Sequence, residues 1–259
     1  MSLWPKEHGA YGQAAFPLAT ALLVAGPSLG GVLLALAVVA GFLAHEPAAV
    51  LWNLRGPHAR RQLGPSATRW LAACLALASL AGIAAAWTVS PATRLALAVP
   101  AIPALGVAWA MLEGREKSWY GETAAAFAFS GSAVPVVMAA GRPFETALAV
   151  ALPFALLFVS TTLAVRVVVL RVRGGRDPRA ADATRAATLI LTTGSLGLLA
   201  ALAWLDAFPG AFAVAAAPGL VAAGSIALRP PSPARLRWVG WTLVGVSIAT
   251  AALVVRAAV

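Results

Sequence analysis

The chain has 259 residues, of which 61% are hydrophobic and 11% are charged, and its mean hydropathy is +0.85. A soluble domain carries about 25% charged residues, so this composition excludes an ordinary soluble fold and indicates a protein embedded in lipid. The net charge of +10 does not indicate nucleic-acid binding, because the arginines stand in short segments between apolar runs.

Nine apolar runs approach the length of about 20 residues that a helix needs to cross a bilayer. Helices are expected because a lone strand in lipid leaves its backbone groups unpaired. The runs lie near 11–26, 29–47, 67–87, 92–112, 122–140, 145–170, 184–204, 208–227 and 236–256. The sequence therefore predicts an all-α polytopic membrane helix bundle with about nine transmembrane helices. We expect a single domain over 1–259, with its longest connection at about 48–66.

Basic residues alternate between the two sides of the predicted bundle. Of the 19 Lys and Arg residues, all but Arg94, Arg142 and Arg256 belong to the N-terminus and to the connections after the second, fourth, sixth and eighth runs. The positive-inside rule assigns this side to the cytoplasm, so we expect a cytoplasmic N-terminus and an external C-terminus. No signal peptide is expected, because Lys6 is the one early positive charge and Glu7 follows it at once.

The fifth run contains an unusual polar interruption, with Ser130, Gly131, Ser132 and Pro135 in the middle of the membrane. Proline removes a backbone donor and frees a carbonyl, and such a break in lipid persists where it faces protein or a wet cavity. Two interpretations follow: a kink satisfied by the serines, or a ligand-binding point. Pro100 and Pro103 predict a similar kink in the fourth run, and Cys74 is expected to be a small buried packing residue.

The remaining polar groups gather at helix ends on the predicted cytoplasmic side. They include the acidic and basic residues between the fourth and fifth runs: Glu113, Arg115, Glu116, Lys117 and Glu122. The predicted catalytic groups are Glu7, His8, His45, Glu46 and Glu122. The predicted substrate-binding groups are Lys6, Tyr11, Asn53, Arg55, Arg115, Lys117, Arg166 and Arg171.

Two adjacent imidazole–carboxylate pairs, Glu7–His8 and His45–Glu46, stand at the ends of the first two predicted helices. They suit a divalent metal, an acid–base pair, or a hydrogen-bonded clamp between the two helices. For Glu46 the alternatives are an ion pair with the basic connection that follows it, or a cavity shared with Arg166. Arg166 itself has a structural alternative, in which its side chain reaches toward the membrane surface.

Three segments and Arg166 resemble the YwiC-like family of bacterial integral membrane proteins. The segments are Trp4-Pro-Lys-Glu-His-Gly-Ala-Tyr11, Phe42-Leu-Ala-His-Glu-Pro47 and Glu116-Lys-Ser-Trp-Tyr-Gly-Glu122. The resemblance implies a bacterial cytoplasmic (inner) membrane protein and no particular activity. In its nine helices, cytoplasmic N-terminus and charged second and sixth connections, the chain also resembles UbiA-type prenyltransferases.

In UbiA-type enzymes two aspartate-rich motifs hold magnesium on a prenyl diphosphate. Here His45, Glu46 and Asn53 stand where the first group of aspartates is expected, and Asp177 and Asp182 lack the spacing of the second. The likeness therefore implies a lipid or isoprenoid substrate, whereas the cofactor is left open, with a divalent metal among the alternatives. The sequence contains no P-loop, dinucleotide fingerprint, nucleophile elbow or zincin motif.

Three functions fit these observations: an intramembrane transferase, a transporter of a small anion or metal ion, and a membrane assembly factor with an unknown protein partner. An odd number of spans without an inverted repeat argues against the common transporter folds. A path through the membrane needs polar groups at several depths. The one-sided polar face therefore favours an enzyme or a docking surface.

Overall fold

The computed structural model describes residues 3–5, 8–172 and 178–258, without the side chains of His8, Val172, Pro178 and Pro233. All regular secondary structure in this part of the chain is helical. The chain divides into two compact units, Met1–Ala147 and Leu148–Val259. The prediction of one domain over 1–259 concerns how these units assemble, and it stays a prediction.

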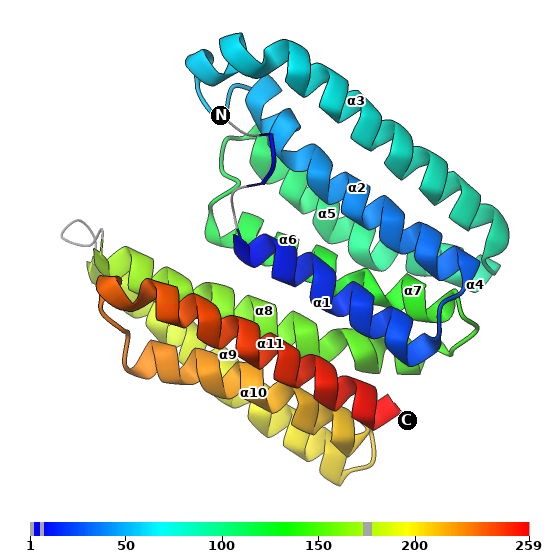
Figure 1. The fold of residues 1–259 in the computed structure, drawn as a ribbon. Coiled ribbons are helices and arrows are strands. Elements are labelled where there is room, and N and C mark those ends of the chain that lie inside the picture. Colours follow the sequence, from blue (N-terminus) through cyan, green and yellow to red (C-terminus); the bar gives the residue numbers. More distant parts are fainter. Residues whose placement is uncertain (1–2, 6–7, 173–177, 259) are drawn as a thin grey trace. The chain divides into compact units, whose positions relative to one another are not determined.

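Unit 1 is built around α2, which packs along α3 and also contacts α1 and α7 (Figure 1). A second antiparallel pair is formed by α5 and α6. Its helices are α1 (His8–Ala25), α2 (Leu29–Leu51), α3 (Pro57–Thr88), α4 (Pro91–Ala96), α5 (Ala98–Leu112), α6 (Trp119–Gly131) and α7 (Ala133–Met138). The tight turn between α1 and α2 uses Gly26 at φ +79° and Ser28, whose hydroxyl accepts the Gly31 N–H at 3.1 Å.

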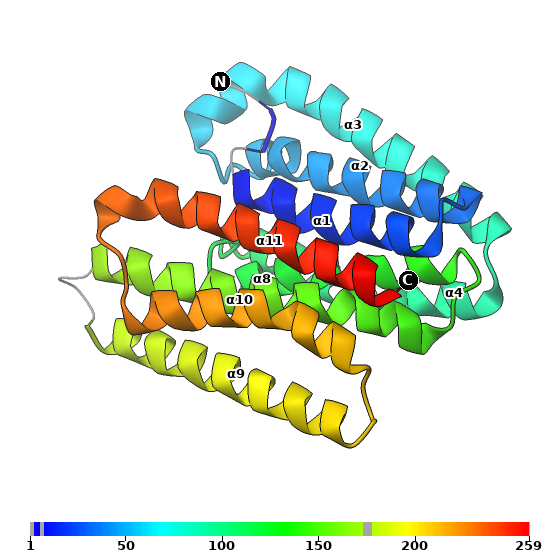
Figure 2. The ribbon, with the colours of Figure 1, turned by 60° about the horizontal axis from the view of Figure 1, so that its bottom comes forward.

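Unit 2 places α10 between α9 and α11, as Figure 2 shows. Its helices are α8 (Phe144–Val172), α9 (Pro178–Trp204), α10 (Gly210–Leu228), the 3-10 turn η1 (Pro233–Arg235) and α11 (Leu236–Ala258). The closest approach is at Gly219 of α10, where an added Cβ would lie 3.0 Å from the Leu157 Cα of α8. Small residues allow this kind of contact between membrane helices.

Seven helical segments are long and apolar enough to cross a membrane: α2, α3, α4 with α5, and α8 to α11. The other two predicted runs correspond to α1, whose apolar part Gly9–Ala25 is shorter, and to the broken pair α6 and α7. Large apolar side chains such as Leu80 and Ile83 are exposed on these helices, as lipid-facing residues are. The predicted polytopic membrane helix bundle is confirmed, and the chain is a multi-pass membrane protein.

The predicted long connection at 48–66 is wrong. Helix α2 continues through Pro47 to Leu51, and α3 begins at Pro57, so the connection covers only 52–56. Proline is favoured at the first position of a helix, and Gly56 precedes it at φ +87°. Hydropathy detects where a helix is apolar, and the first turns of α3 are helical but polar.

Both predicted kinks are helix breaks in the structure. One separates α4 from α5 at Leu97, and the other separates α6 from α7 at Ser132. The Ser132 hydroxyl donates to the Phe129 carbonyl at 2.5 Å, whereas the Ser130 hydroxyl is buried without a partner. Of the two serine hydroxyls, only that of Ser132 therefore bonds to a backbone carbonyl at the break.

The two breaks lie against each other. A Cβ added to Gly131 would be 3.2 Å from Val99 Cγ1 and 3.4 Å from the Val99 carbonyl oxygen. Pro103 cannot donate an N–H to that carbonyl, so the absence of a side chain at Gly131 exposes a polar backbone atom to the second helix. Cys74 is buried, as predicted.

Candidate functional site

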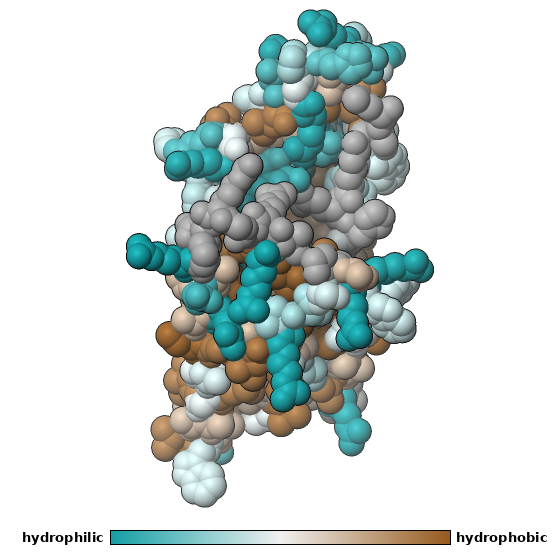
Figure 3. All heavy atoms as spheres, turned by 90° about the vertical axis from the view of Figure 1, so that its left-hand side faces the viewer, coloured by the Kyte–Doolittle hydropathy of each residue, from teal (hydrophilic) through white to brown (hydrophobic). Residues whose placement is uncertain are grey.

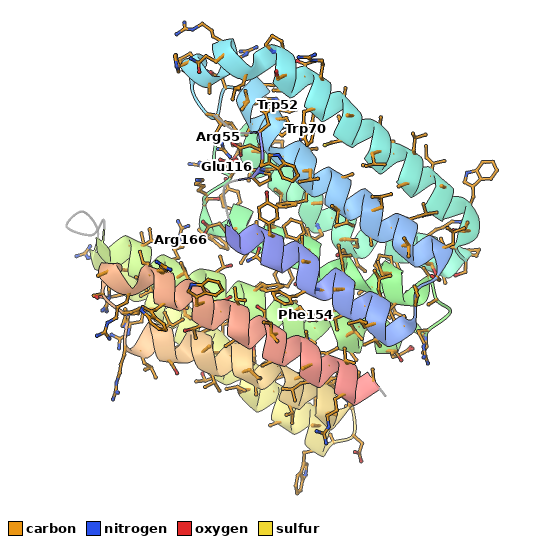
Figure 4. All side chains as sticks on the ribbon, in the orientation of Figure 1. Trp52, Arg55, Trp70, Glu116, Phe154 and Arg166 are labelled. Carbon is orange, nitrogen blue, oxygen red and sulfur yellow. The ribbon has the colours of Figure 1, made fainter. Side chains whose placement is uncertain are left out.

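The polar side chains that the structure brings together are His45, Glu46, Arg55 and Glu116, here called the Arg55 cluster (Figure 4). Arg55 donates from Nε to Glu46 Oε1 at 3.0 Å and from Nη2 to Glu46 Oε2 at 2.8 Å. Its Nη1 donates to Glu116 Oε1 at 2.5 Å. The Nε2 atom of His45 lies 3.4 Å from Glu116 Oε2.

The end of α2 aims Arg55 back at Glu46. Asn53 has a φ of +64°, its N–H donates to the Val50 carbonyl at 3.1 Å, and the Leu54 N–H donates to the Ala49 carbonyl at 2.9 Å. This pair of bonds is a Schellman motif, which ends a helix with a left-handed residue. Asparagine tolerates that conformation, so the observed contribution of Asn53 is to turn the chain.

The end of α5 repeats the same device. Gly114 has a φ of +68°, and its N–H and that of Arg115 donate to the carbonyls of Met111 and Ala110 at 3.0 and 2.7 Å. Glu116 therefore follows its helix end at the same offset as Arg55 follows the end of α2. The Leu54 side chain packs beside Gly114, 3.8 Å from the position of an added Cβ.

A second glycine fixes Glu116 from the other side. A Cβ on Gly121 would lie 2.6 Å from the Glu116 carbonyl oxygen, so no larger residue fits there without moving the backbone. Ser118 caps α6 by accepting the Gly121 N–H at 3.2 Å. The loop that carries Glu116 is thus held between a left-handed glycine and a glycine in backbone contact.

The cluster is largely removed from water. The exposed fraction of the side chain is 4% for Glu46, 12% for Glu116, 23% for Arg55 and 29% for His45. Buried charges are tolerated when they are paired and hydrogen-bonded, and here two carboxylates share one guanidinium. The contacts with His45 and Arg55 lower the pKa of Glu116 to about 2. The hydrogen bond with Glu46 raises the pKa of Arg55 above its usual value.

Some groups of the cluster have complete hydrogen bonds, and others do not. Nε, Nη1 and Nη2 of Arg55 all donate to the two carboxylates, so this arginine is occupied within the protein. Glu116 Oε2 is buried and makes no hydrogen bond of good geometry, and its 3.4 Å contact with His45 is longer than a normal bond. The contact that remains open to adjustment is therefore the one between His45 Nε2 and Glu116 Oε2, in which the carboxylate is held and the imidazole is the more exposed partner.

The chemistry of the predicted site residues includes ligands that suit a divalent metal. Among the described residues, no three His, Cys, Asp or Glu side chains form a metal-binding group. Glu7 and the side chain of His8 lie outside the described residues, and so does Lys6. The predicted pocket shared by Glu7, His8, His45 and Glu46 therefore stays a prediction. Two of its four groups, His45 and Glu46, are described, and both belong to the Arg55 cluster.

The other predicted site residues are distributed around the cluster or lie apart from it. The Tyr11 hydroxyl donates to the Pro5 carbonyl at 3.1 Å, and its ring packs edge-on against Phe42 at 5.0 Å. Arg115 is exposed and lies 3.9 Å from Glu113. Lys117 is exposed in the same loop, and Glu122 is half-buried in the first turn of α6.

Arg166 and Arg171 lie in α8 of unit 2, the first half-buried and the second exposed. Glu46 pairs with Arg55, which is the ion pair with the following connection that the sequence offered as an alternative. Sequence reasoning missed Glu116 as a site residue. The signal that marks it is the pair of glycines, Gly114 and Gly121, on either side of a lone carboxylate.

The fold and this cluster define the class: a multi-pass integral membrane protein with a buried, charge-paired group where the helices of unit 1 end. A family model described as YwiC-like protein matches residues 4–138, and the chain belongs to the YwiC-like family. The match covers just over half of the chain and contains all four residues of the Arg55 cluster. No curated protein and no solved structure matches the chain. The more remote likeness to UbiA-type prenyltransferases stays a prediction.

Proposed function

We propose that this protein is an intramembrane transferase of UbiA-like build that acts on a lipid or isoprenoid substrate at His45. The observation that carries the proposal is the contrast within the Arg55 cluster. His45 is 29% exposed, whereas the Glu116 carboxylate beside it is buried and held by Arg55. A reachable imidazole backed by a fixed carboxylate is the arrangement used for general acid–base catalysis.

Each member of the cluster has a distinct role in this proposal. His45 exchanges the proton with the substrate, and Glu116 orients the ring. Arg55 and Glu46 are positioning residues, since Glu46 holds Arg55 and Arg55 holds Glu116; Figure 4 shows where Arg55 and Glu116 lie. Lys117 and Arg115, exposed in the Glu116 loop, are proposed to bind the anionic part of the substrate, and Glu122 remains a proposed catalytic group.

The test begins with the lipids that copurify with the full-length protein, identified by mass spectrometry and then offered back as substrates. Loss of a general acid–base group lowers turnover by about 10²- to 10⁴-fold, which is the expectation for His45→Asn at equal folded protein. Arg256→Gln, at an exposed arginine of unit 2 that belongs to no predicted site, is the control and should keep full turnover. Unchanged turnover in His45→Asn would refute the proposal.

A transporter is the second candidate, because the two helix breaks of unit 1 meet at Gly131 and Val99. Transporters bind solutes at discontinuous helices in the middle of the membrane, and Ser130 offers a buried hydroxyl without a partner at this break. Flux into liposomes of small anions and of divalent metal ions is the measurement. Loss of flux in Ser130→Ala together with normal flux in His45→Asn would favour the transporter over the enzyme.

We also propose a bacterial cytoplasmic membrane location with the N-terminus in the cytoplasm, as the distribution of basic residues favours. Single cysteines replacing Arg61 and Ala92, in a Cys74→Ala background, test the orientation because both positions are exposed. A membrane-impermeant thiol reagent added outside should label position 92 and spare position 61. The reverse pattern would invert the topology.

A further inference from the structure

A hollow of about 330 Å³ lies beside the start of α3, outside the Arg55 cluster, and is lined by Leu3, Ser66, Arg69 and Trp70. The three α3 residues are spaced by three and four positions, which places them on one face of the helix. Leu3 comes from the N-terminal segment, whose Trp4 ring lies 5.9 Å from the ring of Trp70. The hollow is therefore formed where this segment crosses α3.

The lining offers hydrogen-bond donors and positive charge, and no carboxylate. Ser66 has a hydroxyl and Arg69 a guanidinium, and both residues are exposed, whereas the indole Nε1 of Trp70 is buried and out of reach of a ligand in the hollow. No described carboxylate lies within ion-pair distance of Arg69. Hydrogen bonds between a guanidinium and an anion are charge-assisted and strong, so a ligand that brings an anionic acceptor to this hollow gains from Arg69 and Ser66.

The position of the hollow along α3 points to a lipid as the source of that acceptor. The preceding turns carry the exposed Arg60 and Arg61, and the upper end of Figure 3, where these turns lie, is hydrophilic. From Leu71 onward the helix is apolar, with Leu75 and Leu80 exposed. Tryptophan and arginine mark the level of lipid headgroups, so the hollow lies at headgroup depth above a lipid-facing apolar surface.

We propose that this hollow binds the anionic phosphate headgroup of a membrane lipid, with the acyl or isoprenoid chains running along α3. Arg69 forms charge-assisted bonds to the phosphate oxygens, Ser66 adds a hydroxyl donor, and Trp70 forms part of the wall of the hollow. This binding site does not depend on the reaction proposed for His45. Phosphate is the shared chemistry of a lipid headgroup and a free ion, and the depth of the hollow favours the lipid.

The experiment measures phosphatidylglycerol retained by the full-length protein in phosphatidylcholine nanodiscs, read by native mass spectrometry. A hydrogen bond to a charged group supports at least about a tenfold difference in affinity, which is the loss expected for Arg69→Gln. A loss of a few fold is expected for Ser66→Ala, which removes the second donor. The controls are Arg61→Gln, with the same change of charge on the same helix, and Ser79→Ala, which removes an exposed hydroxyl further along α3.

Three results would overturn the proposal. Equal losses in Arg61→Gln and Arg69→Gln would indicate diffuse attraction to a basic surface. No loss in Arg69→Gln or Ser66→Ala, at wild-type melting temperature, would exclude the hollow. Displacement of phosphatidylglycerol by inorganic phosphate, or binding of inorganic phosphate in nanodiscs of phosphatidylcholine alone, would assign the site to a soluble ion.

Discussion

Two sets of buried polar side chains, one in each unit of this protein, are satisfied in different ways. In unit 1, Glu46 at the end of α2 bonds to Arg55 in the next loop, and Arg55 reaches Glu116 in a loop 61 residues further along the chain. In unit 2, the buried hydroxyls of Thr161, Thr188 and Ser247 bond to carbonyls of their own helices. The charged side chains of unit 1 are therefore paired between elements, whereas these hydroxyls of unit 2 are satisfied within one helix.

This difference indicates which part of the fold can hold a group of charged side chains. A hydroxyl bonded one turn back stabilises its own rotamer and leaves neighbouring helices free to pack through small residues, as Gly219 does against Leu157. A charge cannot be satisfied in this way, so it requires a partner brought by the fold. Glu46 is the one charged residue classed as buried among the described residues, and it lies in the unit that the YwiC-like family model matches.

The largest effect is expected from Arg55→Met, which tests whether charge pairing holds the end of unit 1. The change leaves Glu46 and Glu116 without their guanidinium, and breaking a buried ion pair from one side costs about 3 kcal/mol or more. Thermal unfolding in detergent should show a large loss. The double variant Glu46→Gln with Arg55→Met should recover part of it, whereas Arg171→Met in unit 2 should change the stability by less than about 0.5 kcal/mol. Equal effects in the two units would contradict the comparison.

A second effect concerns pH. The pKa of Glu116 in the folded protein is about 2, below its ordinary value of 4.5. A lowered folded-state pKa means that the stabilisation is complete above pH 4.5 and is lost as pH falls from 4.5 toward 2. Each pKa unit corresponds to about 1.4 kcal/mol, so the loss over these 2.5 units is at most about 3.5 kcal/mol. Melting temperature measured across this window should fall for the wild type.

Glu116→Gln is the matched variant for the pH experiment, since it removes the titrating group and keeps the side-chain shape. It should lower stability at neutral pH and show a smaller change between pH 4.5 and 2. If the two proteins respond to acid in parallel, the acid sensitivity belongs to other carboxylates, and the pairing of Glu116 with His45 and Arg55 contributes little.

Much of the fold could be predicted from the sequence, because a lipid environment requires long apolar helices and each apolar run is visible in the local sequence. The exact ends of those helices could not be predicted, since the first turns of α3 are helical without being apolar. The Glu46–Arg55 pair could be predicted because the two residues are only nine positions apart. The participation of Glu116 could not be predicted, because its position depends on the packing of α5 and α6 and on backbone contacts at Gly121. No rule of sequence spacing describes such contacts. The hollow at Trp70 depends likewise on where the N-terminal segment lies.

Substitutions of buried glycines are expected to have effects of intermediate size, and they compare the two units directly. Gly121→Ala drives a Cβ to 2.6 Å from the Glu116 carbonyl oxygen, and Gly219→Ala drives one to 3.0 Å from the Leu157 Cα. Overpacking of this kind costs about 1–3 kcal/mol, so both variants should lower the melting temperature. Only Gly121→Ala should also lower turnover, because it displaces the loop that carries Glu116.

Gly245→Ala in α11 is the control for both glycine variants. Nothing lies within 4 Å of its added Cβ, and alanine in a helix is favoured over glycine by about 1 kcal/mol. It should therefore leave stability unchanged or raise it slightly. A loss as large as that of Gly121→Ala would mean that the method responds to helix composition rather than to the contacts described here.

The smallest effect is expected from Tyr11→Phe, which tests whether the N-terminal segment is fixed to unit 1 by a bond between elements. The variant keeps the ring on Phe42 and removes only the hydroxyl that donates to the Pro5 carbonyl. A single neutral hydrogen bond contributes about 1 kcal/mol, and this one holds a short segment, so global stability should change little while local opening increases. Hydrogen exchange at Leu3 and Trp4 should accelerate severalfold, with α11 unaffected.

Because Leu3 lines the hollow beside Trp70, retention of phosphatidylglycerol should weaken in the same variant. Faster exchange with unchanged lipid retention would show that the α3 side chains bind the headgroup without the segment that covers them.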